Sequence, residues 1–269
     1  MHNLQYRDYM KTTDESVIES VVVAMDGKEK DIFPFIPYLV QDLWEFGTDA
    51  ELVIKLIYQH QKEYSKLKIL DLGCGKGPVS IKIAKEFNCQ CWGIDAVEEF
   101  IHYAIKKAEE YQVSEICHFS VGDIRQEIKN LAEFDIVILG AIGPVLGDYY
   151  TTLTLLSPLL KKNGMVIMDD AYVDNDGDAS HPLILRKSEI LKQISHAGMN
   201  IIQELIMDKD YIEKSNNQIF KTIKNRAREL EDKYPDKKTL FQNYIKAQEE
   251  ENESMENSLT CSVLLIGKS

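Results

Sequence analysis

The sequence predicts an α/β protein with a doubly wound, seven-stranded sheet and helices on both faces. Three observations lead there: apolar segments of strand length alternate with helical segments, a glycine-rich turn follows the first strand, and acidic residues stand at strand ends. The segment 134–139 is apolar on both faces, as a central parallel strand requires. The expected strands are 68–72, 89–94, 116–121, 134–139, 165–168, 201–207 and 260–266.

A turn rich in glycine joins the first strand to the next helix. The run 69–84 reads ILDLGCGKGPVSIKIA, in which Gly73, Gly75 and Gly77 allow positive φ and a close approach of a ligand to the backbone. Pro78 suits the first helical position and leaves the following amides free to face an anion. Dinucleotide-binding proteins need G-x-G-x-x-G, so the G-x-G-x-G spacing disfavours NAD or FAD.

Two further acids stand at the ends of strands. Asp95 ends the second strand, twenty residues after Gly75, where a carboxylate can accept both hydroxyl protons of a ribose. The third strand runs into Gly122-Asp123-Ile124. Each acid alone is best interpreted as a helix cap or a solvated loop end. Acids at successive strand ends, in this order, indicate a nucleoside-binding site instead.

These features resemble the class I S-adenosylmethionine-dependent methyltransferases, whose first motif places an acid just ahead of G-x-G-x-G, as Asp71 stands here. The resemblance covers residues 66–209 and 259–269. It implies S-adenosylmethionine as cofactor, S-adenosylhomocysteine as product, and a Rossmann-like sheet whose seventh strand lies antiparallel beside the sixth.

The resemblance also assigns parts of the cofactor to residues of this chain. Asp95 would hold the ribose, and Asp123 and Ile124 would hold the adenine. The methionine half would lie on Asp71, Gly73 and Gly75. The sulfur would lie beside Leu139, Gly140 and Ala141, and Cys74, Gly77 and Ala96 would complete the cofactor site.

Two helical regions lie outside the expected sheet of a single domain, 1–269. Residues 1–66 form an N-terminal helical cap, and residues 210–258 form a helical insertion between the sixth and seventh strands, which leaves 67–209 and 259–269 as the core. Apolar residues recur at helical spacing in the insertion, and packing on the sheet would account for most of them. In the enzymes that the chain resembles, such helices close over the cofactor and form the acceptor site, so we expect a small-molecule acceptor.

The charge balance argues against a nucleic-acid substrate. Acidic residues number 44 and basic residues 31, the net charge is −13, and the basic stretch 221–228 is followed at once by acids. No apolar run has the roughly 18 residues of a membrane span, and no signal-peptide pattern opens the chain, so we expect a cytoplasmic protein without membrane contact. Five cysteines without a C-x-x-C pair fit buried thiols in a reducing compartment.

Methyl transfer from a sulfonium requires mainly alignment, so a dedicated base is not essential. If the acceptor must lose a proton, the candidate catalytic residues are Asp170, Tyr172 and His181, which follow the fifth strand at the edge where the methyl group should point. A surface histidine is an equally good interpretation of His181.

Acidic residues between Asp169 and Asp178 are close enough in sequence to consider a metal site. Catechol-type methyltransferases bind Mg²⁺ with an acid after the fourth strand, but Gly140 and Ala141 stand there in this chain. An EF-hand pattern also fails, because Leu183 stands where a bidentate glutamate is needed. We expect no metal.

The sequence thus predicts a methyltransferase that uses S-adenosylmethionine to methylate a small molecule by in-line displacement. The alternatives are a protein or RNA methyltransferase and a non-catalytic S-adenosylmethionine-binding protein, and a nicotinamide oxidoreductase fits the glycine spacing least. The methylated atom, whether N, O, S or C, stays open, as does the choice between a monomer and a homodimer.

Overall fold

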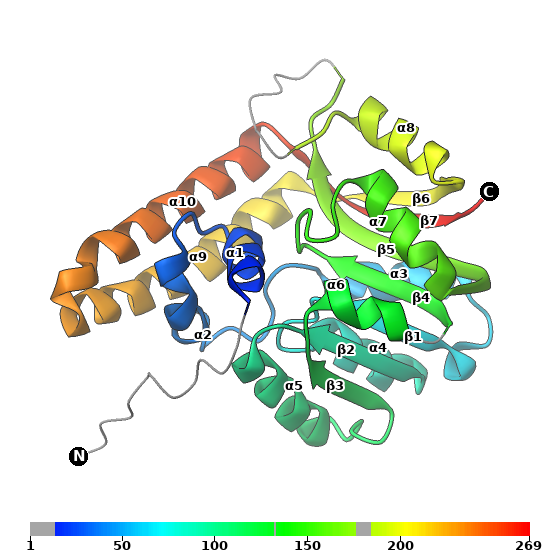
Figure 1. The fold of residues 1–269 in the computed structure, drawn as a ribbon, viewed down its shortest axis with the longest axis horizontal. Coiled ribbons are helices and arrows are strands. Elements are labelled where there is room, and N and C mark those ends of the chain that lie inside the picture. The colour runs from blue at the N-terminus through cyan, green and yellow to red at the C-terminus, as the bar shows by residue number, and fades with distance from the viewer. Residues whose placement is uncertain (1–13, 132, 176–183) are drawn as a thin grey trace.

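A seven-stranded sheet forms the centre of the protein in a computed structural model that describes residues 14–131, 133–175 and 184–269 (Figure 1). The strands are β1 (Lys68–Leu72), β2 (Gln90–Asp95), β3 (Cys117–Val121), β4 (Phe134–Gly140), β5 (Leu160–Tyr172), β6 (Met199–Ile206) and β7 (Thr260–Lys268). Their order is β3-β2-β1-β4-β5-β7-β6, and β7 alone runs antiparallel to its two neighbours. The predicted fold class, including the antiparallel last strand, is confirmed.

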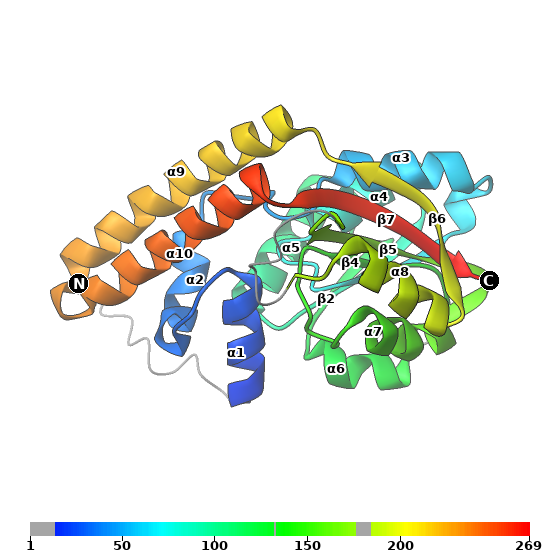
Figure 2. The ribbon, with the colours of Figure 1, turned by 90° about the horizontal axis from the view of Figure 1, so that it is seen from above.

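Helices pack on both faces of this sheet (Figure 2). One face carries α3 (Ala50–His60), α4 (Pro78–Phe87) and α5 (Glu98–Glu110), and the other carries α6 (Ile124–Glu127), α7 (Tyr149–Leu156) and α8 (Lys187–His196). Neighbouring residues of a strand point to opposite faces, so Ile69 and Leu70 of β1 enter different cores. Both faces are therefore buried under helices, which explains the continuous apolar sequence of the central strands.

The helical additions meet beside the sheet and form a third apolar cluster. Its elements are α1 (Glu15–Ala24), η2 (Lys30–Phe35), α2 (Ile36–Leu39), α9 (Lys209–Lys233) and α10 (Lys238–Asn257). The last two lie side by side as a long hairpin (Figures 1 and 2). Ile223 and Phe241 of that hairpin pack with Leu39, and Phe100 of α5 joins them. The apolar stripes of the insertion thus pack on each other and on the N-terminal helices, not on the sheet.

The boundary between α7 and β5 differs from the predicted one. The apolar spacing of 149–160 and the cations and glycine of Lys161–Gly164 predict a helix that ends at Leu160, but α7 ends at Leu156 and a short 3-10 turn follows. Pro158 supplies the reason, since it has no amide hydrogen to continue the helical hydrogen bonds, and it lies at the start of the 3-10 turn. The strand then begins at Leu160 and extends to Tyr172, so Asp169 and Asp170 lie within it instead of in a following loop.

Two further observations concern the described residues. All five cysteines are buried and unpaired, as expected for packed thiols. In the described part of the chain, no helix is both long enough and apolar enough to cross a membrane.

Candidate functional site

The glycine turn lies at the carboxyl end of β1 and is held against β2. The amides of Gly73 and Cys74 donate to the Ile94 carbonyl at 2.8 and 3.1 Å. Gly73 has a φ of +72°, and a Cβ there would lie 2.5 Å from a methyl carbon of Ile142. Glycine is therefore required at Gly73 for both conformation and space.

Asp95 connects the end of β2 to the glycine turn. Its two carboxylate oxygens accept the amides of Gly75 at 2.9 Å and Val97 at 2.8 Å. Burial raises the pKa of Asp95, and these amide hydrogen bonds oppose the increase. Each carboxylate oxygen has two acceptor positions, so the pair can still accept a further donor, although the Ala96 amide also lies close to it.

Asp71 lies beneath the turn and points into the protein. It is 3% exposed and accepts a hydrogen bond from the Ser80 hydroxyl of α4 at 2.7 Å. Burial raises the pKa of Asp71 to about 6, with a smaller contribution from Asp95. The side chain therefore braces the turn against α4, and Ser80 is a partner that the sequence pattern did not reveal.

Asp123 caps α6, which is the structural interpretation offered from sequence for such an acid. It accepts the Arg125 amide at 3.0 Å and the Arg125 side chain at 2.8 Å. The same guanidinium reaches the Ser16 hydroxyl of α1 at 3.2 Å, and Ile124 beside the cap is buried. Arg125, which sequence reasoning missed, thus links the end of β3 to the N-terminal helices.

The residues expected near the sulfur lie at the end of β4. Leu139 is buried, Gly140 pairs with Asp169 of β5, and Ala141 is exposed with a φ of +53°. A Cβ on Gly140 would lie 2.4 Å from the hydroxyl oxygen of Thr48. Thr48 therefore faces the end of β4 directly, although it precedes Gly140 by 92 residues in the chain.

Residues 40–48, which we call the cap segment, lie across the glycine turn and are held there by Lys76. This lysine is 3% exposed, and its ammonium donates to the carbonyl oxygens of Val40 at 2.5 Å and Leu43 at 2.6 Å. In return, the indole nitrogen of Trp44 donates to the Lys76 carbonyl at 3.1 Å. Burial lowers the pKa of Lys76 to about 8, and nearby Asp42 opposes that change.

The candidate catalytic residues have different surroundings. Asp170 accepts a hydrogen bond from the Tyr149 hydroxyl at 2.8 Å, and burial raises the Asp170 pKa. Tyr172 is 3% exposed and lies in a polar cluster with Glu204, at 2.7 Å, and Lys187, at 3.0 Å. His181 lies outside the described residues. Thus Asp170 lies within β5, one residue past the last pair with β4, whereas the Tyr172 hydroxyl already contacts Glu204 of β6 and Lys187 of α8.

Asp169 was considered from sequence only as part of an acidic run. It lies on the opposite face of β5 from Asp170, near Thr48 and the cap segment. Burial raises the pKa of Asp169 to about 7, and the charge of Asp170 adds to the increase. The length of β5 places this carboxylate beside Gly140, which the shorter predicted strand did not.

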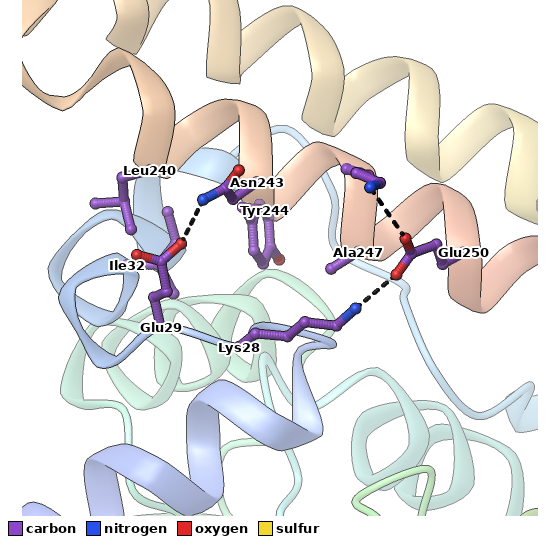
Figure 3. Close-up of a pocket in the computed structure, with 9 residues that line it drawn as sticks. Lys28, Glu29, Ile32, Leu240, Asn243, Tyr244, Ala247 and Glu250 are labelled. Atoms are coloured by element: carbon purple, nitrogen blue, oxygen red, sulfur yellow. Dashed lines mark hydrogen bonds and ion pairs between the residues drawn. The ribbon is translucent and has the colours of Figure 1, made fainter. Parts of the chain in front are cut away.

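A pocket of about 210 Å³ lies elsewhere, between η2 and α10 (Figure 3). Its rim is crossed by contacts of Lys28 with Glu250 at 2.5 Å and of Asn243 with Glu29 at 2.8 Å. None of the residues predicted for cofactor or acceptor lines it. Because its rim consists of surface ion pairs and polar contacts, we do not assign the chemistry to this pocket.

Comparison with known proteins identifies the class. The model of a family described as "Methyltransferase domain" matches residues 63–228, and the chain therefore belongs to that family. A structure of an S-adenosylmethionine-dependent methyltransferase from Thiobacillus denitrificans, with S-adenosylhomocysteine, shares the fold. Its TM-score is 0.71 at 18% identity, over 87% of this chain and 98% of the other. The chain thus belongs to the methyltransferase-domain family and has the fold of an S-adenosylmethionine-dependent enzyme, which confirms the predicted family.

Curated relatives differ in what they methylate. The chain is 28% identical over 179 residues to a ubiquinone biosynthesis O-methyltransferase of Rickettsia canadensis, which covers 59% of this chain and 74% of the relative. It is 42% identical over 69 residues to a tRNA (guanine(37)-N(1))-methyltransferase of Paramecium tetraurelia, which covers 24% of this chain and 15% of the relative. The chain thus spans only a small part of the tRNA enzyme, and these likenesses leave the acceptor class open.

Proposed function

We propose that this methyltransferase transfers the sulfonium methyl group to a small-molecule acceptor. The observation that supports this most is the cap segment, which lies over the glycine turn and reaches Gly140 through Thr48. A segment held this closely over the turn would obstruct a duplex or a folded protein more than it would a small acceptor.

In this proposal the cofactor lies along the carboxyl ends of β1, β2 and β4. Asp95 uses its remaining acceptor positions for the two ribose hydroxyls, while the amides of the glycine turn receive the methionine half. Asp123 and Ile124 contact the adenine. Leu139 to Ala141 flank the sulfur, at the point where β4 ends beside β5.

The reaction is an in-line displacement on the methyl carbon. The acceptor atom forms a bond to this carbon as the bond to sulfur breaks, and the sulfonium becomes a neutral thioether. Alignment of the two reactants can supply roughly 7 to 11 kcal/mol of the barrier reduction. The cap segment contributes by excluding water from the reacting atoms.

An RNA acceptor is the rival that a relative suggests, and charge argues against it. RNA binding needs unneutralised lysines and arginines on one face. Here Lys82 is paired with Glu45 at 2.7 Å, and Arg226 is paired with Asp42 at 2.6 Å. Cations beside the cap segment are thus neutralised internally, which agrees with the net charge of −13.

The test is to incubate the protein and isotopically labelled S-adenosylmethionine with separated small-molecule, protein and RNA fractions of a cell extract. We expect label in the small-molecule fraction, and none from Asp95→Ala. Label confined to RNA or protein would contradict the proposal. Cofactor binding without label in any fraction would favour the non-catalytic binding protein.

A further inference from the structure

A partly buried carboxylate, which has no cation partner in the described part of the chain, lies beside the expected position of the methyl group. Asp169 ends the pairing of β5 with β4, opposite Gly140. Among residues 14–131, 133–175 and 184–269, no lysine, arginine or histidine forms an ion pair with Asp169. Removing a carboxylate from water is costly unless a positive group or several hydrogen bonds compensate it.

The charges around Asp169 do not supply that compensation. Asp170 follows Asp169 in β5. Asp49 directly follows the cap segment, and its carboxylate accepts a hydrogen bond from the Tyr211 hydroxyl of α9 at 2.8 Å. Burial and the charges of Asp49, Glu45 and Asp169 raise the pKa of Tyr211 to about 12. The potential at this place is therefore negative.

The buried thiol of Cys261 in β7 lies near the same carboxylates. Burial raises its pKa to about 12, and the charges of Asp169, Glu251 and Asp170 add to the increase. Lys209, at the start of α9, acts in the opposite direction and does not reverse it. Tyr211 of α9 and Cys261 of β7 thus both lie near Asp169.

A second observation also indicates a ligand. The Thr48 side chain is only 8% exposed, and within the described residues its hydroxyl oxygen has no hydrogen bond of standard geometry, only a weaker contact with Asp169. That oxygen lies 2.4 Å from where a Cβ on Gly140 would stand, and near enough to Asp169 to oppose the rise of its pKa. A buried hydroxyl without a partner is costly, and this one faces the place where acceptor and methyl group should meet.

We propose that Asp169 and Thr48 receive the protonated amino group of the acceptor, so that the methylated atom is an amine nitrogen. The inference rests on the proposed small-molecule function and names its substrate class. An ammonium group matches both features, because it carries the missing positive charge and donates three hydrogen bonds. A neutral hydroxyl acceptor would bring no positive charge of its own to the carboxylate.

The proposed step balances in protons and charge. The ammonium of the acceptor transfers one proton to the Asp169 carboxylate, which becomes a neutral acid and frees the nitrogen lone pair. The lone pair attacks the methyl carbon, the carbon–sulfur bond breaks, and its electrons remain on sulfur. The products are a methylated ammonium and neutral S-adenosylhomocysteine, and Asp169 then releases its proton to water.

The experiment compares primary amines with alcohols of the same carbon skeletons as acceptors for labelled S-adenosylmethionine. We expect label in amines, and a kcat/KM for them that falls about 10- to 100-fold in Asp169→Asn and about 3- to 10-fold in Thr48→Val. The isosteric Asp169→Asn retains its affinity for S-adenosylhomocysteine, which shows that it is folded. With that product bound, an amine raises the melting temperature of the wild type but not of Asp169→Asn.

The other outcomes separate the two proposals. Label in the alcohols alone would overturn the amine assignment and leave the small-molecule function intact, whereas label only in RNA or protein would overturn the function itself. If Asp169→Asn weakens S-adenosylmethionine but not S-adenosylhomocysteine, and amine turnover at saturating cofactor is unchanged, the carboxylate serves the sulfonium and the inference fails. Loss of amine turnover in Asp170→Asn but not in Asp169→Asn would overturn it as well.

Discussion

Replacing Lys76 by methionine should release the cap segment from the glycine turn. Methionine retains most of the length and apolar character of the lysine side chain, so little cavity is created. What is lost is the pair of hydrogen bonds from the ammonium to the carbonyls of Val40, at 2.5 Å, and Leu43, at 2.6 Å. Val40 keeps a partner, because its carbonyl also accepts the Leu43 amide at 3.0 Å.

The size of the effect follows from these contacts. Hydrogen bonds from a charged donor contribute about 1.5 to 3 kcal/mol each, so two contribute about 3 to 6 kcal/mol. Burial of the ammonium, visible in its pKa of about 8, offsets part of this. We expect a net loss of about 2 to 3 kcal/mol, and since each kcal/mol shifts the melting temperature of a chain of this size by about 2 to 4 °C, a decrease of roughly 5 to 10 °C.

The chain offers a matched control for this measurement. Lys82 of α4 also contacts the cap segment, through Glu45 at 2.7 Å, but Glu45 is half exposed. A surface ion pair contributes about 0 to 1 kcal/mol, so Lys82→Met should barely change the melting temperature in differential scanning calorimetry. Equal shifts for the two variants, or a Lys76→Met protein as stable as the wild type, would refute this reasoning.

Two further predictions concern the same region. Gly140→Ala places a Cβ 2.4 Å from the Thr48 hydroxyl oxygen, so it should displace Thr48 and lower both the melting temperature and the rate of methyl transfer. The control is Gly143→Ala, because nothing lies within 4 Å of a Cβ there. This control should lose only the stability that a non-glycine residue loses at a φ of +62°. Comparable losses in both would contradict the steric account. Because the pKa of Lys76 falls from 10.5 to about 8 on folding, the unfolded chain binds more protons between these values, and the free energy of unfolding of the wild type should rise relative to Lys76→Met as pH increases through this range. A flat difference, measured by denaturant titration, would show that the lysine is not buried in solution.

The sheet and the positions of its acidic strand ends could be predicted because their signals are local. Strand periodicity, glycine spacing and an acid at a strand end are each visible within a few residues, as at Asp71 and Asp95. The conformations fit the expectation, since Gly73 and Gly75 have positive φ and the Gly75 amide is bound to Asp95. These features are largely independent of what the flanking helices do.

The contacts of the cap could not be predicted, because they join residues far apart in sequence. Lys76 appears in sequence as an ordinary cation within the glycine turn, and its burial depends on carbonyls some 33 to 36 residues earlier. Thr48 carries no motif and gains significance only from Gly140. Such contacts leave no periodic signal in a single sequence.

Both ends of β5 differ from the prediction, and at its start the sequence held a signal that a stronger pattern outweighed. Pro158 marks the end of the helix, yet the apolar spacing of 149–160 favoured a longer one. The antiparallel neighbour β7 pairs with β5 as far as Tyr172, whereas the parallel neighbour β4 pairs only as far as Asp169. The pairing with β7 therefore extends β5 past its predicted end. Asp169 consequently lies near Thr48 of the cap segment instead of in a hydrated loop.

Calorimetric titration with S-adenosylhomocysteine tests the central claim, that the cofactor lies on Asp95 at the carboxyl ends of β1 and β2. The variant is Asp95→Asn, which keeps the shape of the side chain and one acceptor oxygen, and its melting temperature without ligand shows whether it folds. Loss of charge-assisted hydrogen bonds to two ribose hydroxyls should weaken binding by about 10- to 100-fold. An unchanged dissociation constant in a folded Asp95→Asn protein would place the ribose elsewhere and contradict the account.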